Sequence, residues 1–384
     1  MPKGKGLLER CYLALMLLGL GLPASAQDLR EYWPMEAFLE RHAEQRPLMH
    51  AFERRVSESG RSIPAEQRPD VPVTVSVIYP GLQISDYWRR NLVAFEGRAR
   101  ELDLPLDLRV FFSGDARDQA VLQVQQLREA LAHEPDFLIY TLDTPAHMAL
   151  IDRLLARAPG AERPHIILQN ITTPVRAWNG LQPLMYVGFD HLQGSHLLLD
   201  HIRSQAREGD EIVVLYGTDG YVSRARGDTL TRSLVDASAP RLRDTYLTDQ
   251  NVDIAEQATL DALARHRDLR FIFACTTDTA LTSVRTLVSQ ARADVQVTGW
   301  GGGGAELQAI REGTLSATVM RLNDDAGVAM AEAIALQVRG MGHEIPQIYS
   351  GGMHLVTRDT PAEELEALMQ RAFRYSGVPD LVRH

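Results

Sequence analysis

Residues 73–90 read Val-Thr-Val-Ser-Val-Ile-Tyr-Pro-Gly-Leu-Gln-Ile-Ser-Asp-Tyr-Trp-Arg-Arg, and this stretch decides the fold that we expect. The alternating β-branched residues from Val73 to Ile78 predict a strand, the Pro-Gly pair ends it, and Asp86 is a residue type that begins helices. In an open α/β sheet, ligands bind outside the carboxyl ends of the strands, where this loop must lie. The loop lacks the glycine spacing of a phosphate-binding turn. We therefore expect it to contact an uncharged, hydroxyl-rich or ring-shaped ligand rather than a nucleotide.

Residues 1–26 have the three-part pattern of a cleaved secretory signal peptide. Lys3, Lys5 and Arg10 precede an apolar run over residues 11–22, which is followed by Pro-Ala-Ser-Ala. The run is too short for a membrane anchor, because crossing the hydrocarbon core takes about 20 apolar residues. We expect cleavage after Ala26, a periplasmic location and no direct insertion into a membrane.

Charge and cysteine content narrow the class of protein. The chain carries a formal charge of −10, and the expected cleavage removes three basic and one acidic side chain, so the charge becomes −10 − 2 = −12. An acidic exported protein is a poor candidate for nucleic-acid binding. Cys275 is the one thiol left after cleavage, so no internal disulfide can form, and its place at the end of an apolar strand predicts that it is buried.

From residue 73 onward, apolar strands alternate with amphipathic stretches of 10–20 residues. This alternation predicts parallel sheets built from right-handed strand–helix–strand units. The expected strands are 73–79, 106–112, 137–142, 165–170, 184–188, 211–216, 243–247, 270–275, 295–300 and 316–320. The expected helices are 87–103, 115–133, 145–158, 191–207, 224–237, 253–267, 278–292, 304–312 and 324–340. About ten strands favour two doubly wound α/β lobes over one large sheet.

Three places break the alternation and are candidate crossings between the lobes: residues 170–174, 321–325 and 350–352. Three crossings would make both lobes discontinuous and would form a hinge of three short strands. The expected division is a signal peptide (1–26), an N-terminal helical extension (27–70), lobe I (71–175 and 322–350) and lobe II (176–321 and 351–384).

Motifs for catalysis are missing from the sequence. It contains no G-x-S-x-G elbow, no H-E-x-x-H and no C-x-x-C. His191 and His196 are five residues apart, which does not stack two ligands on one helix face, so solvated surface is the expected interpretation of both. With no nucleophile placed beside a base, we expect no enzyme, no metal and no protein cofactor.

Polar and aromatic residues gather instead in the loops at the expected strand ends. The candidate ligand-binding residues are Gln83, Ser85, Tyr87, Trp88, Asn170, Arg226, Thr277, Asp278, Trp300 and Arg321. Singly, each has another explanation: the Asn and Asp residues cap turns, Trp300 belongs to the core, and the arginines pair with surface carboxylates. Together, they combine flat apolar surfaces, hydrogen-bonding groups for hydroxyls and two guanidinium groups. Two arginines exceed what a neutral sugar needs, so an anionic or strongly polar ligand is favoured.

These stretches resemble the LuxP family of periplasmic autoinducer-2 receptors, within the ribose-binding-like periplasmic binding proteins of type I. The resemblance rests on the strings Gln-Ile-Ser-Asp-Tyr-Trp, Ile-Leu-Gln-Asn-Ile-Thr-Thr-Pro-Val-Arg, Tyr-Val-Gly-Phe-Asp-His and Met-Arg-Leu-Asn-Asp-Asp, and it spans the mature chain. It implies that the candidate residues line the pocket and that Arg226 and Arg321 face a negatively charged borate.

The resemblance also implies a biological role. The family binds autoinducer-2 as a furanosyl borate diester, with boron as part of the ligand, and acts in quorum sensing. Its partner is the periplasmic domain of a membrane hybrid sensor histidine kinase, which responds to closure of the two lobes.

Three alternatives remain open from the residues alone. A sugar-binding component of an ABC importer would share the fold, but the arginine pair would then be in excess. An exported hydrolase would need a nucleophile and base that the motifs do not supply. A transcriptional repressor of the same fold is disfavoured by the signal peptide and by the lack of a helix-turn-helix segment.

Overall fold

The computed structural model describes residues 29–81, 85–113, 119–142, 145–156, 164–235, 237 and 239–381. The expected signal peptide and Gln83 lie outside the described residues. No helix among the described residues combines the length and the apolar character needed to cross a membrane.

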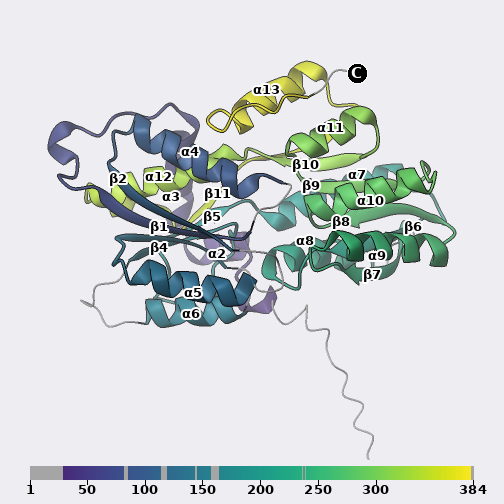
Figure 1. The fold of residues 1–384 in the computed structure, drawn as a ribbon, viewed down its shortest axis with the longest axis horizontal. Helices are drawn as coiled ribbons and strands as arrows, with labels where there is room; N and C mark the ends of the chain where they lie inside the picture. Colours follow the sequence, from purple (N-terminus) through teal and green to yellow (C-terminus); the bar gives the residue numbers. More distant parts are fainter. Residues whose placement is uncertain are drawn as a thin grey trace, which may run out of the picture.

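The first lobe is built on a six-stranded sheet in the order β11-β5-β4-β3-β1-β2. Its elements, with the N-terminal extension, are η1 (Leu29–Glu31), α2 (Met35–Arg41), α3 (Gln45–Ser57), η2 (Ala65–Gln67), β1 (Val73–Tyr79), α4 (Tyr87–Glu101), β2 (Leu106–Phe112), α5 (Gln119–Leu131), β3 (Phe137–Thr141), α6 (Pro145–Leu155), β4 (His165–Gln169), η3 (Arg176–Trp178), β5 (Met185–Gly188), α12 (Asp324–Val338), η4 (Gly342–Glu344) and β11 (Ile348–Ser350). Helices α3, α4 and α12 cover one face, and α5 and α6 cover the other (Figure 1).

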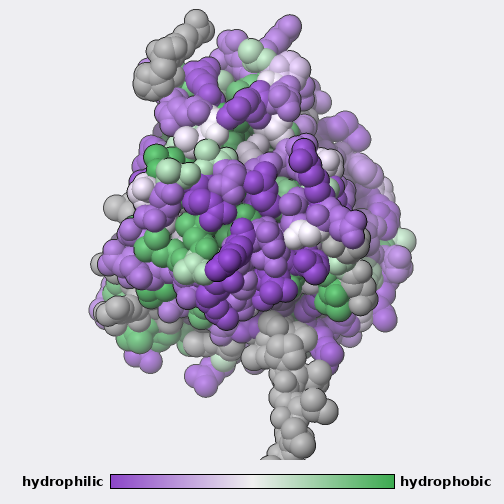
Figure 2. Space-filling view, turned by 90° about the vertical axis from the view of Figure 1, so that its right-hand side faces the viewer, coloured by the Kyte–Doolittle hydropathy of each residue, from purple (hydrophilic) through white to green (hydrophobic). Residues whose placement is uncertain are grey.

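The second lobe repeats this plan with a sheet in the order β12-β10-β9-β8-β6-β7. Its elements are α7 (His191–Gln205), β6 (Glu211–Tyr216), α8 (Tyr221–Ser233), β7 (Arg241–Leu247), α9 (Val252–Arg265), β8 (Leu269–Ala274), α10 (Thr277–Ser289), β9 (Gln296–Gly301), α11 (Gly304–Glu312), β10 (Ala317–Arg321), β12 (Met353–Thr357) and α13 (Ala362–Ala372). Helices α7 and α8 pack on one face, and α9, α10 and α11 on the other (Figure 1). The end of this lobe exposes mainly hydrophilic side chains, with separate hydrophobic areas between them (Figure 2).

Local sequence explains why the expected elements form. The ten expected strands are all present, with ends within two residues of their predicted limits, because each is a short apolar run between helix-forming stretches. Side chains cap the helices that follow. Asp190 accepts hydrogen bonds from the backbone of Leu192 and Gln193 at the start of α7, and Asn251 does the same for α9. The predicted α/β fold of two doubly wound sheets is therefore confirmed.

The structure corrects the position of the first crossing. Strand β5 pairs with β4 and β11, so it belongs to the first sheet rather than to lobe II, where the boundary at residues 175/176 had placed it. The chain leaves the first lobe after Gly188, because residues 170–174 lead from β4 to η3 and β5 of the same sheet. A second difference is β12, which runs antiparallel to β10 in an otherwise parallel sheet.

The three crossings lie side by side and are hydrogen-bonded to one another. The backbone N–H of Gly351 donates to the carbonyl of Gly188 at 2.8 Å, and the N–H of Leu322 donates to the carbonyl of Gly352 at 2.9 Å. These bonds join neighbouring crossings into one hinge. Both lobes can therefore rotate about it without breaking either sheet.

The N-terminal extension touches both lobes. Helix α3 packs against α12 and β11 of the first lobe. Tyr32 forms an isolated backbone bridge with Val175, and its ring centroid lies 4.5 Å from that of Tyr221 on α8 of the second lobe. Tyr221 in turn hydrogen-bonds the hydroxyl of Thr173. The extension is thus a second connection between the lobes.

Residues 373–377, which we call the C-terminal segment, also reach across. Helix α13, just before it, packs on the second lobe, where Phe373 belongs to the core. The backbone N–H groups of Tyr375 and Ser376 donate to the carboxylate of Asp324 on α12 at 2.7 and 2.8 Å. Arg90 on α4 donates to the carbonyl of Gly377 at 2.7 Å. The segment therefore holds the second lobe to the helices that cover the first.

Helices α4 and α12 approach closely because Gly327 faces the α4 backbone. A Cβ atom at residue 327 would lie 2.3 Å from the carbonyl oxygen of Asn91 and 2.8 Å from the nitrogen of Phe95. We predict that Gly327→Ala lowers the free energy of unfolding, since overpacking costs about 1–3 kcal/mol and exceeds the gain of up to about 1 kcal/mol in helix propensity. Urea unfolding followed by circular dichroism measures the difference.

Gly342→Ala is the matched control. The nearest atoms to a Cβ there all belong to the side-chain amide of Gln337, with the oxygen at 2.3 Å, and this amide is the movable end of a flexible side chain at the end of α12. Its unfolding curve should overlay that of the wild type. Equal stability of Gly327→Ala and Gly342→Ala would contradict the tight packing of α4 on α12.

Candidate functional site

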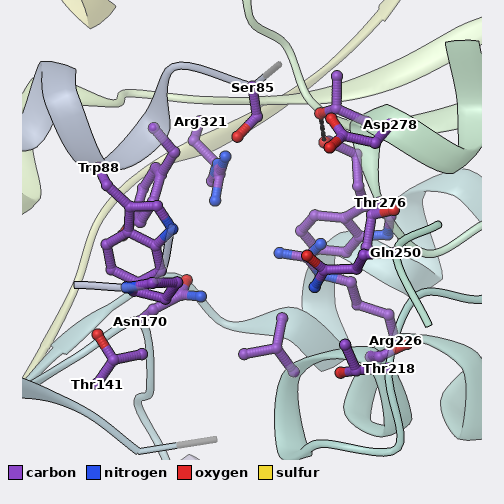
Figure 3. A pocket seen from close by; sticks show the side chains of 16 residues that line it. Ser85, Trp88, Thr141, Asn170, Thr218, Arg226, Gln250, Thr276, Asp278 and Arg321 are labelled. Carbon is purple, nitrogen blue, oxygen red and sulfur yellow. Dashed lines mark hydrogen bonds between the residues drawn. The ribbon is translucent and has the colours of Figure 1, made fainter. Parts of the chain in front are cut away.

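A cavity lies between the lobes, at the carboxyl ends of both sheets. It encloses about 710 Å³ not filled by atoms, counting the space at its mouth. Its lining residues are Pro80, Ser85, Tyr87, Trp88, Thr141, Asn170, Thr218, Val222, Ser223, Arg226, Gln250, Thr276, Thr277, Asp278, Trp300 and Arg321. Trp88, Asn170 and Arg321 lie along one wall, and Arg226, Gln250 and Asp278 lie along the opposite wall (Figure 3). The cavity therefore faces groups from both lobes.

Strand ends place most of these side chains. In the first lobe, Trp88 follows β1, Thr141 ends β3 and Asn170 follows β4. Asn170 has a left-handed backbone conformation (φ 67°), which asparagine tolerates better than most residues. In the second lobe, Trp300 lies in β9 and Arg321 ends β10. Parallel strands thus bring together residues that are more than 200 positions apart in sequence.

Arg226 is held by three contacts. Its Nη1 donates to the carbonyl of Cys275 at 2.7 Å, and its Nε donates to Nδ1 of His191 at 3.3 Å. Its guanidinium carbon lies 4.2 Å from the centroid of the Trp300 ring, within the range of a cation–π interaction. The orientation of the guanidinium is therefore fixed before any ligand binds.

Arg321 is held differently, because aromatic rings take the place of hydrogen bonds. Although it ends a strand of the second lobe, its guanidinium carbon lies 4.0 Å from the ring centroid of Tyr87 and 5.7 Å from that of Phe189. Its Nε is buried and has no hydrogen-bond partner among the described residues. Arg321 therefore rests on aromatic rings at the wall that it shares with Trp88 and Asn170, and its Nε is a donor without a partner among the described residues.

The two guanidinium groups are buried without a counter-ion. Arg226 and Arg321 are each 5% exposed, and no carboxylate of the described residues lies within 4.0 Å of either. Burial, followed by the charge of Arg321, lowers the pKa of Arg226 to about 9. Burial also lowers the pKa of Arg321. Burial is the first cause of both shifts, so both directions indicate guanidinium groups that have lost hydration.

The charge of Glu306 acts on both arginines, but its carboxylate is hydrogen-bonded to other groups. Its oxygens accept hydrogen bonds from the backbone of Trp300 and Gly302, at 2.9 and 2.7 Å, and from the hydroxyl of Thr318 at 2.8 Å. Burial raises the pKa of Glu306. Its role is to fix the β9–α11 turn that carries Trp300.

The two tryptophans supply more than apolar surface. The indole Nε1 atoms of Trp88 and Trp300 are buried and lack a hydrogen-bond partner among the described residues, as does the side-chain oxygen of Asn170. Trp300 fits against Gly194 of α7, where a Cβ atom would lie 2.2 Å from the ring. Buried polar groups are normally paired, so these unpaired atoms are candidates for hydrogen bonds with a ligand.

Thr277 mainly supports the wall. Its hydroxyl donates to the carbonyl of Trp300 at 2.7 Å, so it links α10 to the end of β9. Thr276 caps α10 by accepting a hydrogen bond from the backbone of Thr279 at 3.3 Å. Asp278, in the first turn of α10, presents its carboxylate to the cavity (Figure 3).

Nine of the ten candidate residues line this one cavity, and the tenth, Gln83, lies outside the described residues. The residues that the sequence did not single out are Pro80, Thr141, Thr218, Val222, Ser223, Gln250 and Thr276. The rule that led to the others, proximity to a strand end, applies to them as well. Gln250 follows β7, whose alternating exposed and half-buried residues made that strand end less prominent.

The structure corrects the interpretation of His191. It is 1% exposed and lies beside Arg226, whereas His196 is exposed as expected. Cys275 is buried as predicted, and burial raises the pKa of its thiol to about 12. The described residues contain no group of three side chains suited to hold a metal ion.

Comparison with known proteins identifies the family. The family described as Periplasmic binding protein domain matches residues 75–342, more than half of the chain, so the chain belongs to it. The ribose import binding protein RbsB of Salmonella typhimurium is 26% identical over 160 residues, covering 40% of this chain and 52% of the relative. RbsB of Escherichia coli is 26% identical over 175 residues, covering 44% and 57%. The chain spans about half the length of these relatives.

Solved structures share the fold at lower identity. A periplasmic solute binding protein from Actinobacillus succinogenes with bound D-allose has a TM-score of 0.63 at 19% identity, covering 75% of this chain and 98% of that one. One from Agrobacterium vitis with α-D-tagatopyranose has a TM-score of 0.64 at 16% identity, covering 77% and 98%. The XylFII–LytSN complex has a TM-score of 0.63 at 14% identity, covering 76% and 100%. These structures establish the fold alone.

The unpaired charge of Arg321 leads to a prediction about stability. Replacing a buried ion pair by apolar side chains of similar volume is often neutral or stabilising, by about 1–4 kcal/mol, and a buried charge without a partner is less favourable still. We expect Arg321→Met to raise the melting temperature of the ligand-free protein, because it removes repulsion with Arg226 and the burial of an unpaired cation. Differential scanning calorimetry without ligand measures the shift.

Arg98→Met is the control for burial of an arginine as such. Arg98 is also fully buried, but its Nη1 lies 3.3 Å from a carboxylate oxygen of Glu332, so its removal leaves that buried acid with only the longer contact to Arg55, at 3.8 Å, among the ion pairs of the described residues. Breaking such a pair costs about 3–5 kcal/mol. If Arg321→Met lowered the melting temperature as strongly as Arg98→Met, the assignment of Arg321 as an uncompensated charge would be wrong.

Proposed function

We propose that this chain is a periplasmic receptor for autoinducer-2, bound as its furanosyl borate diester between the two lobes. The observation that carries the proposal is the pair Arg226 and Arg321, two buried guanidinium groups that line one cavity without a carboxylate partner among the described residues. A ligand that is both hydroxyl-rich and negatively charged matches this pair.

The argument from charge is physical. An isolated buried cation is unfavourable, and a bound anion removes this penalty by supplying charge-assisted hydrogen bonds. A neutral pentose forms hydrogen bonds with arginine but leaves the net charge of the site unchanged. A tetrahedral borate carries one negative charge and several oxygen acceptors. It therefore satisfies the arginines in a way that a neutral sugar does not.

The rest of the cavity suits the ring of such a ligand. Trp88 and Trp300 offer flat surfaces and unpaired indole N–H donors, and Asn170 offers an unpaired amide oxygen. Acceptor and donor groups of this kind pair with ring hydroxyls. The site provides binding groups rather than a nucleophile beside a base, which favours recognition over catalysis.

Ligand contacts divided between two lobes also favour a closed state. A ligand that touches Trp88 of the first lobe and Arg226 of the second binds more tightly when the lobes are together, so it shifts the population toward closure. We propose that the periplasmic domain of a membrane hybrid sensor histidine kinase binds differently to the closed form than to the open form. The partner rests on the sequence resemblance, and the closure rests on the geometry.

The second candidate function is the sugar-binding component of an ABC importer. It is favoured by the relatives named ribose import binding protein and by the solved structures with bound D-allose and α-D-tagatopyranose. The indole and amide groups would serve a sugar equally well. The importer function does not explain why two arginines without a carboxylate partner among the described residues line the cavity.

Calorimetry on ligand-stripped protein distinguishes the two functions. We predict that the autoinducer-2 precursor binds at least about ten-fold more tightly with borate present than without it, and that ribose and galactose bind more weakly than either. The reason is that the borate charge adds contacts worth about 1.5–3 kcal/mol each. Tighter binding of a plain sugar, with no response to borate, would reject the receptor function in favour of the importer.

Single substitutions test the charge assignment in the same assay. Arg226→Ala or Arg321→Ala should weaken binding of the borate ligand by about 10- to 150-fold, matching the loss of one charge-assisted contact. Trp88→Phe keeps an aromatic surface but loses the indole N–H and part of the ring area, so it should weaken binding while the preference for borate persists. Unchanged affinity in both arginine variants would contradict the proposed ligand charge.

A further inference from the structure

His191 occupies a position between the two lobes that the proposed binding function does not by itself explain. It is the first residue of α7, directly after the crossing that leaves the first sheet. Its Nε2 lies 3.1 Å from the carbonyl oxygen of Asn170, and its Nδ1 lies 3.3 Å from Nε of Arg226. One imidazole thus joins the end of β4 in the first lobe to α8 in the second.

The two partners determine the tautomer. A carbonyl oxygen only accepts hydrogen bonds, and a guanidinium only donates them. The proton of the neutral ring must therefore be on Nε2, which leaves Nδ1 as the acceptor for Arg226. The opposite tautomer would leave a buried guanidinium donor facing an N–H group.

The charged and titratable groups around the ring keep it neutral. Burial, followed by the charge of Arg226 and then that of Arg321, holds the pKa of His191 well below its usual range. Tyr221 is the other titratable side chain in contact, and burial raises its pKa, so it is a neutral phenol. Its ring centroid lies 6.2 Å from that of His191, and the ring of Trp300 lies 5.6 Å away. Acid-base chemistry around neutral pH therefore leaves the two hydrogen bonds intact.

The acceptor on His191 also determines which donors of Arg226 remain for a ligand. Nε is directed to His191, and Nη1 donates to the carbonyl of Cys275. These two bonds orient the plane of the guanidinium across the Trp300 ring. The two hydrogens on Nη2 and the second hydrogen on Nη1 then remain for a ligand, in fixed directions.

We infer that His191 is a positioning residue of the binding site. Its imidazole, protonated on Nε2, donates to the backbone carbonyl of Asn170 and accepts a hydrogen bond from Arg226. In this way it fixes the orientation of the Arg226 guanidinium group. This inference rests on the proposed function for its consequence, because the oriented arginine is the one that meets the ligand charge. Asn170 also lines the cavity with its side chain, so His191 links ligand-contacting residues of both lobes. His191 itself is not among the residues that line the cavity.

Two near-isosteric substitutions separate the two hydrogen bonds. In His191→Asn, the amide oxygen takes the position of Nδ1 and keeps the acceptor for Arg226. In His191→Gln, the amide nitrogen takes the position of Nε2 and keeps only the donor to Asn170. His191→Leu removes both. We expect His191→Asn to bind the autoinducer-2 precursor with borate within about three-fold of the wild type, and the other two variants to bind about ten-fold more weakly.

A double-mutant cycle with Arg226→Ala shows whether the effect passes through the arginine. In that background, His191→Leu should cause no further loss, because the group that it positions is absent. A purely structural role would give the same loss in both backgrounds and would make His191→Asn as weak as His191→Leu. Either result would overturn the inference. Melting temperatures of all variants identify any that fail to fold. If His191→Leu fails to fold, the comparison of His191→Asn with His191→Gln still tests the inference.

A ligand-free measurement separates this inference from the proposed function. Nitrogen-15 NMR of imidazole-labelled wild-type protein should show His191 as a neutral ring with its proton on Nε2 at pH 7. A proton on Nδ1, or an imidazolium, would overturn the inference whichever ligand binds. If borate had no effect on binding while this tautomer was observed, the ligand assignment would fail and the positioning role would stand.

Discussion

Two like charges buried together, with no carboxylate of the described residues within ion-pair distance, are the constraint around which this site is built. Arg226 and Arg321 repel each other and have lost most of their hydration, yet both are held in place by aromatic rings. Ring faces stabilise a cation without neutralising it, whereas a carboxylate would cancel the charge that a ligand is to meet. The protein thus keeps the positive charge available, and part of the binding free energy comes from relieving that repulsion.

Much of this arrangement was predictable because the relevant signals are local. An apolar run followed by a helix-forming stretch marks a strand end, and the strand ends gave nine cavity residues, including Trp88 and Arg321. The sheet to which β5 belongs was not predictable in this way. Its partners are β4, nearby in sequence, and β11, more than 150 residues later, and such pairing is decided by tertiary packing.

His191 illustrates the same limit at the level of one side chain. Its spacing of five residues from His196 argued against a pair of metal ligands, but it did not show whether His191 is buried. What makes His191 a buried hydrogen-bonding group is the meeting of β4, α7 and α8, which places an acceptor on one side of the ring and a donor on the other. Arg321 is similar, since no local pattern shows that a residue of the second sheet will rest on Tyr87 of the first lobe.

The connections outside the hinge bear on how the lobes can move apart. Opening separates Tyr32 from either Val175 or Tyr221, and it strains the hydrogen bonds between the C-terminal segment and Asp324. Because these contacts are made between groups of the chain itself, they favour closure independently of a ligand and reduce the population shift that the ligand has to supply. Repulsion between the arginines acts in the opposite direction, because Arg321 rests on Tyr87 of the first lobe while Arg226 belongs to the second. The balance between closed and open states is therefore determined jointly by the terminal segments and by the charge at the centre of the cavity.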